Sequence, residues 1–259
     1  MLGLEQIKQY YPENLKGFER FMLREYLQYK ILEILFESVY ANKFVFIGGT
    51  ALRIVHGNNR FSEDLDFDNF HISPEEFTEV AKKIQLGLEL EGYKVDFRSV
   101  TKAAYHCYIR FPNLLYDNKL SGHSEEKIFI RLDTEAQQFD FSPERHLLNR
   151  FDVFTEIKVT PVDILLAQKF LTIIERRQSK GRDFYDVVFL LGKDVRPNFD
   201  FLAQKASLSN SIDLKEAVLK RISSLDMNKI AEDVKPFLIN PKEIKKVEMF
   251  GDYLKQVDF

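Results

Sequence analysis

The sequence of 259 residues lacks several features that would place it in a specialised class of proteins. It has one cysteine, Cys107, so no disulfide forms within the chain, and a reducing compartment is expected. It has no tryptophan, so its 24 phenylalanines and 11 tyrosines must fill the large core positions. No apolar run approaches the roughly 18 residues that a membrane helix needs, and the N-terminal segment has no stretch of signal-peptide length. We therefore expect a cytoplasmic protein that does not enter a membrane.

A broad positive charge is missing as well. Lysine and arginine number 37 against 40 aspartates and glutamates, which gives a net charge of −3. This balance argues against a broadly basic nucleic-acid-binding coat, although it leaves room for a local basic patch. With only 11 glycines and 8 prolines the chain is neither collagen-like nor linker-like, and a hydrophobic content of 45% is that of a globular protein.

The periodicity of the apolar residues predicts a mixed α/β part followed by a helical part. Strands are expected at 44–47, 64–68, 93–112, 127–135 and 151–159, and helices at 13–38, 50–57, 73–90, 161–178 and 182–192. Ser73 with Pro74, and Thr160 with Pro161, have the residue types of helix starts. The composition changes near residue 160, which predicts one domain over residues 1–159 and a helical domain over residues 160–259.

A glycine-rich turn follows the first predicted strand. The apolar run FVFI ends at Gly48, Gly49 and Thr50, where a short helix is expected. Glycines let the backbone approach a phosphate, amides at a helix start bind anions, and Thr50 adds a hydroxyl donor. The turn is therefore a candidate phosphate site, although many such turns bind nothing. Further along, Arg60 and Ser62 are additional candidates for a nucleotide or phosphate contact, and Arg60 for an RNA contact as well.

Two carboxylates come next, on a stretch with strict strand alternation. Asp64 and Asp66 project from one face, while Leu65 and Phe67 point to the other. Two close carboxylates repel each other, and a divalent cation such as Mg²⁺ with oxygen ligands relieves that repulsion. A solvated edge strand is the alternative explanation, and Asp68 fits it equally well.

Such chemistry usually uses a third acid from a neighbouring strand. Asp133 is the preferred candidate, since Arg131 and Asp133 share one strand face while Ile130 and Leu132 take the other. Asp96 is the rival, and either acid is otherwise an ordinary exposed strand residue.

The helical part contributes a lysine in aliphatic surroundings and a pair of acids. Lys169 either extends its ammonium to water or points at an anion. Asp183 and Asp186 lie on one face of the predicted helix 182–192, where Asp183 also has the position of a capping residue. The nearby basic residues Arg176, Arg177, Lys180 and Arg182 are either a guide for a polyanion or a solvated helix end.

Taken together, these motifs resemble a known family. The stretch GGTAL followed by RFSEDLDF is similar to the first motif of the DNA polymerase β-like nucleotidyltransferase superfamily, and more closely to the AbiEii/AbiGii toxin family. Fourteen residues separate Gly49 from Asp64, a spacing that suits the AbiEii type better than the wider superfamily. Arg131 stands where the family has the lysine of a Lys-x-Asp motif, and Lys169, Asp183 and Asp186 match its lysine and Asp-x-x-Asp.

The resemblance implies a fold and an enzymatic activity. It implies an α/β (α+β) nucleotidyltransferase core, with a mixed β-sheet flanked by helices, and a C-terminal helical domain. It implies transfer of a nucleoside monophosphate from an NTP to an acceptor hydroxyl, with Asp64, Asp66 and Asp133 holding two Mg²⁺ ions. RNA, tRNA ends in particular, would be the acceptor, and the protein would be the toxin of a type IV toxin–antitoxin or abortive-infection pair with an antitoxin encoded nearby.

Roles of individual residues follow from the same resemblance. Gly48, Gly49 and Thr50 would hold the β- and γ-phosphates, Lys169 would contact phosphate, and Asp183 would be needed for activity. Two other functions stay open on the sequence alone. One is a small-molecule nucleotidyltransferase of the antibiotic-modifying kind. The other is a nucleotide- or RNA-binding protein without catalysis, although three intact acids count against it.

Overall fold

A computed structural model describes every residue of the chain except Lys16 and Ala103, and it divides the chain into two compact units. The first unit comprises residues 1–51 and 62–159, and the second comprises residues 52–61 and 160–259. The chain thus passes into the second unit after Val159, near the predicted change of composition. The excursion of residues 52–61 into the second unit was not expected from the sequence.

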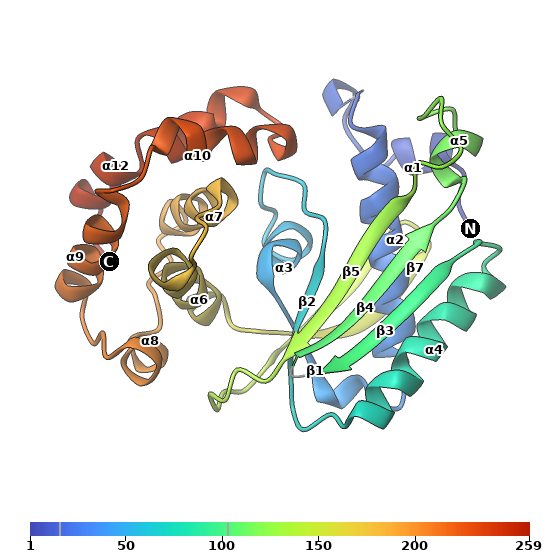
Figure 1. Cartoon of the computed structure of the whole chain (residues 1–259), viewed down its shortest axis with the longest axis horizontal. Coiled ribbons are helices and arrows are strands. Elements are labelled where there is room, and N and C mark those ends of the chain that lie inside the picture. The colour runs from blue at the N-terminus through green and yellow to red at the C-terminus, as the bar shows by residue number, and fades with distance from the viewer. Residues whose placement is uncertain (16, 103) are drawn as a thin grey trace. The chain divides into compact units, whose positions relative to one another are not determined.

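A seven-stranded sheet forms the first unit, with the strand order β3-β4-β5-β2-β1-β7-β6 (Figure 1). Two of its strand pairs, β2 with β5 and β1 with β7, are parallel, and the other pairs are antiparallel. The sheet is therefore mixed, as predicted. The strands are β1 (Phe44–Ile47), β2 (Leu65–Asn69), β3 (Asp96–Lys102), β4 (Ala104–Phe111), β5 (Ile128–Glu135), β6 (Glu144–Arg150) and β7 (Val153–Val159).

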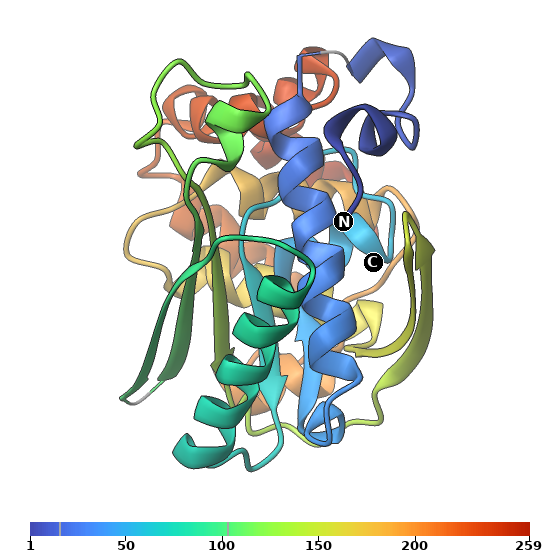
Figure 2. The same ribbon diagram turned by 90° about the vertical axis from the view of Figure 1, so that its right-hand side faces the viewer.

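Two long helices cover one face of this sheet, as Figure 2 shows. Helix α2 (Glu19–Phe36) packs on β5 and β7, and helix α4 (Pro74–Leu90) packs on β3 and β4. Alternate strand residues point to these helices and are buried, among them Phe67, Ile109 and Leu132. Ser73 caps α4 with a side-chain hydrogen bond from the Glu76 amide, as its residue type predicted. Two short helices, α1 (Leu4–Lys8) and α5 (Leu114–Asp117), complete this unit.

Helix α3 (Gly48–Ile54) starts directly at the end of β1, and the boundary between the units falls within it. No loop residue separates strand from helix, because Gly48 adopts a φ of +80° and turns the chain at once. Only glycine takes this conformation without cost.

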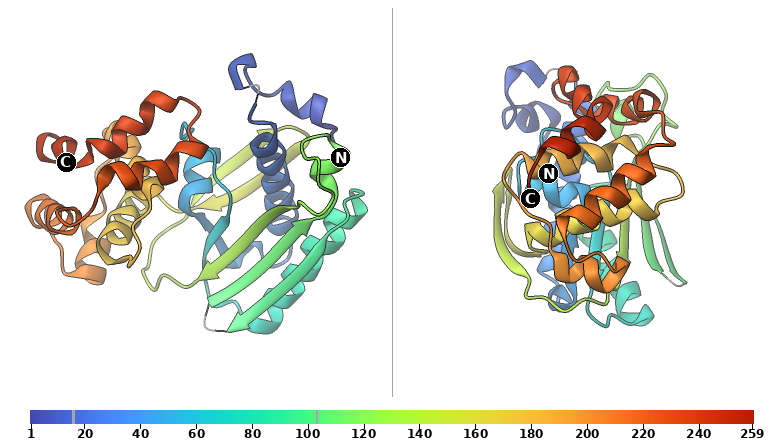
Figure 3. Two further views of the ribbon diagram at one scale, coloured as in Figure 1. Left: turned by 45° about the horizontal axis from the view of Figure 1, so that its top comes forward. Right: turned by 90° about the vertical axis from the view of Figure 1, so that its left-hand side faces the viewer.

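The second unit is helical, and Figure 3 allows its helices to be followed to the C-terminus. Its core is built around α6 (Val162–Glu175) and α7 (Gly181–Leu191), whose inner side chains, such as Phe170 and Phe184, are fully buried. The remaining helices are α8 (Phe199–Ala206), α9 (Ser211–Ile222), α10 (Met227–Val234), α11 (Lys245–Glu248) and α12 (Phe250–Gln256). Within the described residues, no helix is both long and apolar enough to span a membrane.

Three expectations need correction. The predicted helix 13–38 is a short 3-10 turn at Glu13–Leu15 followed by α2, and the predicted strand 93–112 is the hairpin of β3 and β4. Strand β6 was not predicted at all. Helix α6 has Pro161 at its N-cap without a side-chain cap, so Thr160 does not cap it.

Candidate active site

Three aspartates meet on the face of the sheet opposite α2 and α4. Asp66 of β2 and Asp133 of β5 are direct partners in the register of these parallel strands, and neighbouring strands lie about 4.8 Å apart. Asp64 directly precedes β2, and Arg131, which pairs with Asp133, also contacts the Asp64 carboxylate. We call Asp64, Asp66 and Asp133 the acid cluster.

Asp96 lies elsewhere on the sheet. It begins the edge strand β3, which is separated from β2 by β4 and β5, and its carboxylate pairs with Lys127 at 2.7 Å. Of the two candidates for the third acid, Asp133 is therefore the one adjacent to Asp66.

Two side chains hold the acids of the cluster. Arg131 Nη2 lies 3.2 Å from Asp64 Oδ2, and Arg131 Nε lies 2.7 Å from Asp133 Oδ2 in an ion pair that lacks hydrogen-bond alignment. On the other side of Asp133, Oδ1 lies 2.6 Å from Nδ1 of His106. Asp133 is thus held at both oxygens. Sequence reasoning missed His106, because only the pairing of β4 with β5 places it opposite Asp133.

The donor chemistry of the acid cluster suits a hard divalent cation, since Asp66 and Asp133 are register partners and Arg131 contacts both Asp133 and Asp64. The side chains are not arranged as a finished metal site, however. Across the described part of the chain, no group of three or more His, Cys, Asp or Glu side chains has metal-binding geometry. The guanidinium of Arg131 bridges Asp64 and Asp133 and offsets their mutual repulsion in this state.

The glycine-rich turn is built against the acid cluster. A Cβ atom at Gly48 would collide with Oδ2 of Asp66, so the bare backbone of this residue lies directly beside that carboxylate. Thr50 is fully buried, and its hydroxyl donates a hydrogen bond to the main-chain oxygen of Asp64. The Thr50 side chain therefore fixes the backbone of the acidic segment.

Helix α2 fixes the same segment from the other side. The side-chain amide of Gln28 donates to the main-chain oxygens of Ser62 at 3.1 Å and Glu63 at 2.9 Å. Arg24 pairs with the Glu63 carboxylate at 2.9 Å. Two turns of one helix thus determine how the chain enters β2, just before Asp64.

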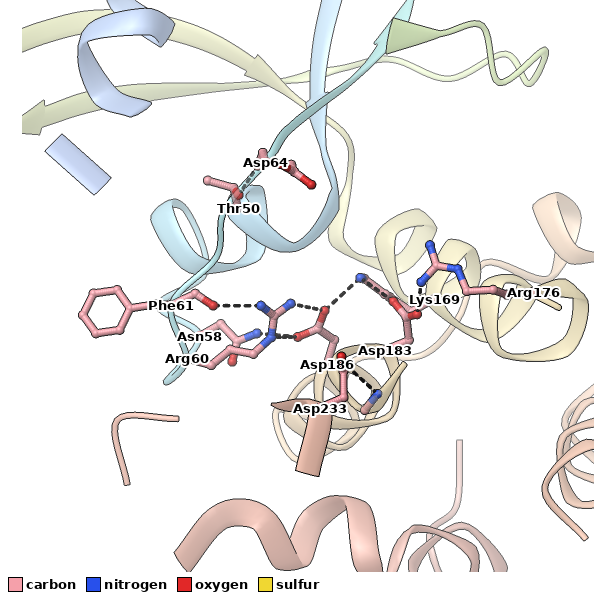
Figure 4. A network of polar contacts seen from close by, with 11 residues as sticks. Thr50, Asn58, Arg60, Phe61, Asp64, Lys169, Arg176, Asp183, Asp186 and Asp233 are labelled. Atoms are coloured by element: carbon pink, nitrogen blue, oxygen red, sulfur yellow. Dashed lines mark hydrogen bonds and ion pairs between the residues drawn. The ribbon is translucent and has the colours of Figure 1, made fainter. Parts of the chain in front are cut away.

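The second unit holds a separate network of buried charges (Figure 4). At its centre, the fully buried Asp186 accepts two hydrogen bonds from the Arg60 guanidinium, at 2.8 and 2.7 Å, and one from Asn58 at 2.8 Å. Arg60 is only 2% exposed, so its guanidinium has almost no surface left for a phosphate or RNA. Instead, it anchors residues 58–60 to helix α7.

Lys169 joins the same network. Its ammonium lies 2.8 Å from Asp186 Oδ2 and 3.1 Å from Asp183 Oδ1, while Arg176 contacts the other oxygen of Asp183 at 2.5 Å. The lysine thus neither extends into water nor stands alone. The anions it points at are the two acids of Asp-x-x-Asp, which share one helix face as predicted.

Pairing decides the protonation of these buried groups. Burial alone would raise the pKa of Asp186, but Arg60 and Lys169 outweigh it and hold that pKa below its ordinary value. Burial would likewise lower the pKa of Lys169, and the charges of Asp186 and Asp183 raise it above its ordinary value. Asp186, Lys169 and Arg60 are therefore all charged at neutral pH.

The remaining features that the sequence analysis singled out have simpler roles. Cys107 is a buried core residue with a free thiol, and its burial raises the pKa of that thiol. In the basic segment, Arg176 pairs with Asp183 and Arg182 lies over the Phe237 ring at 4.6 Å.

Comparison with known proteins gives this geometry a context. Residues 30–254 match the model of a family described as nucleotidyl transferase AbiEii toxin, type IV toxin–antitoxin system. This match covers most of the chain and includes both charge clusters. No curated protein matches the sequence significantly.

Solved structures share the fold at low sequence identity. MenT4, a nucleotidyltransferase toxin from Mycobacterium tuberculosis, aligns with a TM-score of 0.57 and 16% identity, over 100% of this chain and 91% of its own. JHP933 from Helicobacter pylori aligns with a TM-score of 0.54 and 16% identity, over 91% and 92% of the two chains. A putative nucleotidyltransferase from H. pylori gives 0.53 and 16%, over 91% and 95%. At this identity the likeness shows the fold.

Proposed function

Since this chain belongs to the AbiEii family of type IV toxin–antitoxin nucleotidyltransferases, and is therefore a nucleotidyltransferase, we propose that it transfers a nucleoside monophosphate from an NTP to a hydroxyl of RNA. A tRNA end is the expected acceptor. The observation that carries the proposal is the register of β2 and β5, which pairs Asp66 with Asp133 beside Asp64. The family also implies an antitoxin that holds the protein in check.

The acid cluster is the proposed binding site for Mg²⁺, with two ions as the expected number. When bound, the metal would neutralise charge on the triphosphate and on the attacking and leaving oxygens. Asp64, Asp66 and Asp133 would supply its protein ligands. Because Arg131 bridges Asp64 and Asp133 in the structure, its guanidinium has to release at least one of them when the ions bind.

The reaction is a substitution at the α-phosphorus of the NTP. The acceptor oxygen forms the new bond to phosphorus, the bond to the bridging oxygen of the β-phosphate breaks, and pyrophosphate leaves. Asp133 is proposed to help remove the hydroxyl proton, and His106 and Arg131 orient its carboxylate. The Gly48–Gly49 turn, next to Asp66, is proposed to contact the phosphates through its backbone.

Thr50, Ser62 and Arg60 have contacts that favour holding the chain over touching nucleotide. Thr50 and Ser62 take part in the bonds that fix the acidic segment, and Arg60 is buried against Asp186. Lys169 and Asp183 remain proposed as residues required for activity, as the family resemblance implies. Their mutual ion pair supports a positioning role within the second unit.

Label transfer tests the proposal directly. Purified protein is incubated with Mg²⁺, each α-labelled NTP in turn and total bacterial RNA, alongside the double variant Asp64→Asn/Asp66→Asn. We expect label in an RNA band with the wild type and loss of at least a thousandfold in the variant, as for removal of essential catalytic groups.

Asp96→Asn provides the matched control, because it makes the same change on another strand of the same sheet. It should leave label transfer near the wild-type rate. Activity that persists in the double variant would contradict the assignment of the acid cluster. Pyrophosphate released with a small-molecule extract, but never with RNA, would instead support a small-molecule nucleotidyltransferase.

A further inference from the structure

The face of the sheet that carries the acid cluster continues as a row of aromatic and basic side chains. Strand alternation sends Cys107, Ile109 and Ile130 into the core and their neighbours to this face. The neighbours that matter here are His106, Tyr108, Arg110, Phe129 and Arg131, on β4 and β5.

The rings of this row lie next to one another, starting at the acid cluster. His106 contacts Asp133, and its ring centroid lies 6.3 Å from that of Tyr108. The Tyr108 ring in turn lies 6.0 Å from the Phe129 ring, and the two planes differ by only 12°. A path of ring surfaces therefore leads away from Asp133 across the sheet.

This path is reachable by a ligand. Phe129 is 37% exposed, although phenylalanine side chains are normally buried, and Tyr108 is half-buried. Exposed faces of antiparallel strands usually carry polar side chains. Two rings with nearly parallel planes in such a place offer ring surfaces on which other planar groups can stack.

Arginines accompany the rings. The Arg110 guanidinium lies 5.6 Å from the centroid of the Phe129 ring, and Arg98 of β3 is the exposed register partner of Tyr108. Throughout the part of the chain that the structure describes, no carboxylate forms an ion pair with Arg98 or Arg110. Their charges therefore stay available for an anionic ligand.

We propose that four members of this row, His106, Tyr108, Arg110 and Phe129, together with Arg98 of β3, form an acceptor platform that binds the single-stranded end of the RNA acceptor. The inference rests on the proposed transfer to RNA and adds where the acceptor lies. Unpaired bases stack on the rings, and the arginines pair with the phosphates. The hydroxyl at the end of the strand then comes to lie at the acid cluster.

The length of the platform favours a strand over a single nucleotide. From the His106–Asp133 pair to the Arg110–Phe129 pair the strands advance four residues, or about 13 Å. One base covers only one ring, so the whole platform suits two or more consecutive bases. A duplex does not suit it, because the bases inside a duplex already stack on one another and leave no free face.

RNA binding without NTP and without metal tests the platform apart from catalysis. The probe is a fluorescent single-stranded RNA oligonucleotide with a free 3′ hydroxyl, followed by anisotropy, with its duplex as a second probe. In Tyr108→Leu and Phe129→Leu we expect the Kd for the single strand to rise about tenfold each. Tyr108→Phe keeps the ring and should bind like the wild type.

Phe154→Leu is the matched control, because Phe154 is an exposed phenylalanine on β7 of the same sheet. It should leave the Kd unchanged. In Arg98→Gln and Arg110→Gln the slope of log Kd against log salt should fall by about one, as expected when one phosphate contact is lost.

The outcomes separate this inference from the proposed function. Unchanged RNA affinity in both leucine variants would overturn the platform. Label transfer to RNA by the wild type would still support the proposed function. If the leucine variants lost duplex binding as much as single-strand binding, the platform would also be overturned. The same holds if, in label transfer, these variants raised only the KM of the NTP, because the rings would then hold the nucleotide base. The variant Asp64→Asn/Asp66→Asn should still bind the single strand, since its platform is intact.

Discussion

Gly48 meets two requirements that no other residue type would satisfy. Its φ of +80° lies in the left-handed region, and a Cβ there would collide with the Asp66 carboxylate. The first requirement concerns backbone strain, and the second concerns the position of an acid in the acid cluster. The two effects can be separated by experiment, because other glycines of the first unit have a positive φ but open space at the Cβ position.

We predict that Gly48→Ala lowers the rate of label transfer at least a hundredfold, because the new methyl group displaces Asp66. Strain adds a loss of about 1–2 kcal/mol in the free energy of unfolding. Gly92→Ala is the control, since Gly92 has a φ of +91° but open space around its Cβ position. It should lose similar stability in urea unfolding and keep its activity. Equal activity in the two variants would rule out the steric argument.

Asp186 is the residue on which the buried charge network depends. Removal of its carboxylate leaves Arg60 buried without its partner and Lys169 with only Asp183. We predict that Asp186→Ala lowers the free energy of unfolding by about 3–5 kcal/mol, the usual cost of breaking a buried ion pair from one side. Urea unfolding followed by circular dichroism measures this.

A surface pair offers the comparison within the same unit. Glu232 and Lys235 form an ion pair with both side chains more than half exposed. Glu232→Ala should change the stability by at most about 0.5 kcal/mol. If both variants lost a similar free energy of unfolding, burial would not be what makes the Asp186 contacts strongly stabilising.

At the scale of elements, strands with a core-facing alternation, such as β5 and β7, were predictable, whereas β6, which lacks one, was not. In β5 and β7 every second residue is buried, so the period of two is plain in the sequence. Strand β6 lies at an edge of the sheet, and in it only Leu148 is buried. A strand with one buried residue leaves no periodic signal in its sequence, whatever hydrogen bonds it makes.

Helix packing in the second unit depends on another glycine. A Cβ at Gly181, the first residue of α7, would collide with the main-chain oxygen of Ile230 in α10. Because main chain cannot give way as a side chain does, we predict that Gly181→Ala costs about 1–3 kcal/mol of stability in urea unfolding.

Gly251→Ala makes the same change at a helix position where it should do no harm. Gly251 lies in α12, and its Cβ would meet only the terminal methyl of Ile222 at 3.1 Å. That side chain is able to shift, and alanine is the better helix former by about 1 kcal/mol. We expect the variant to be neutral or stabilised, and a loss equal to that of Gly181→Ala would contradict the packing argument.

For the whole molecule, local patterns identified the acids but not their partners. Asp64, Asp66 and Asp133 were predictable because each shows a one-face spacing within a few residues. The pairing of Arg60 with Asp186 spans 126 residues, and His106 reaches Asp133 only through the β4–β5 register. No local period encodes such contacts, which is why Arg60 was predicted to touch phosphate or RNA and His106 was overlooked.

The pH dependence of global stability follows from the same long-range pairing. The pKa of Asp186 lies below its ordinary 3.8 in the folded chain, so its contribution is complete above that value. It is lost as the pH falls through the folded pKa. The pKa of Lys169 is raised above 10.5, so its contribution is complete below that value and is lost as the pH rises through the folded pKa. Between about pH 5 and pH 9 both contributions are therefore constant.

We predict that the difference in unfolding free energy between the wild type and Asp186→Asn is constant across that range and narrows below about pH 4. There the unfolded wild type binds a proton at residue 186 that the folded state refuses, whereas asparagine binds none in either state. Urea unfolding of both proteins at pH 2.5, 4, 6 and 8 measures the difference. A difference that stays constant down to pH 2.5 would mean that the Asp186 carboxylate has the same pKa folded and unfolded, so that its ion pairs with Arg60 and Lys169 do no more than offset the cost of its burial.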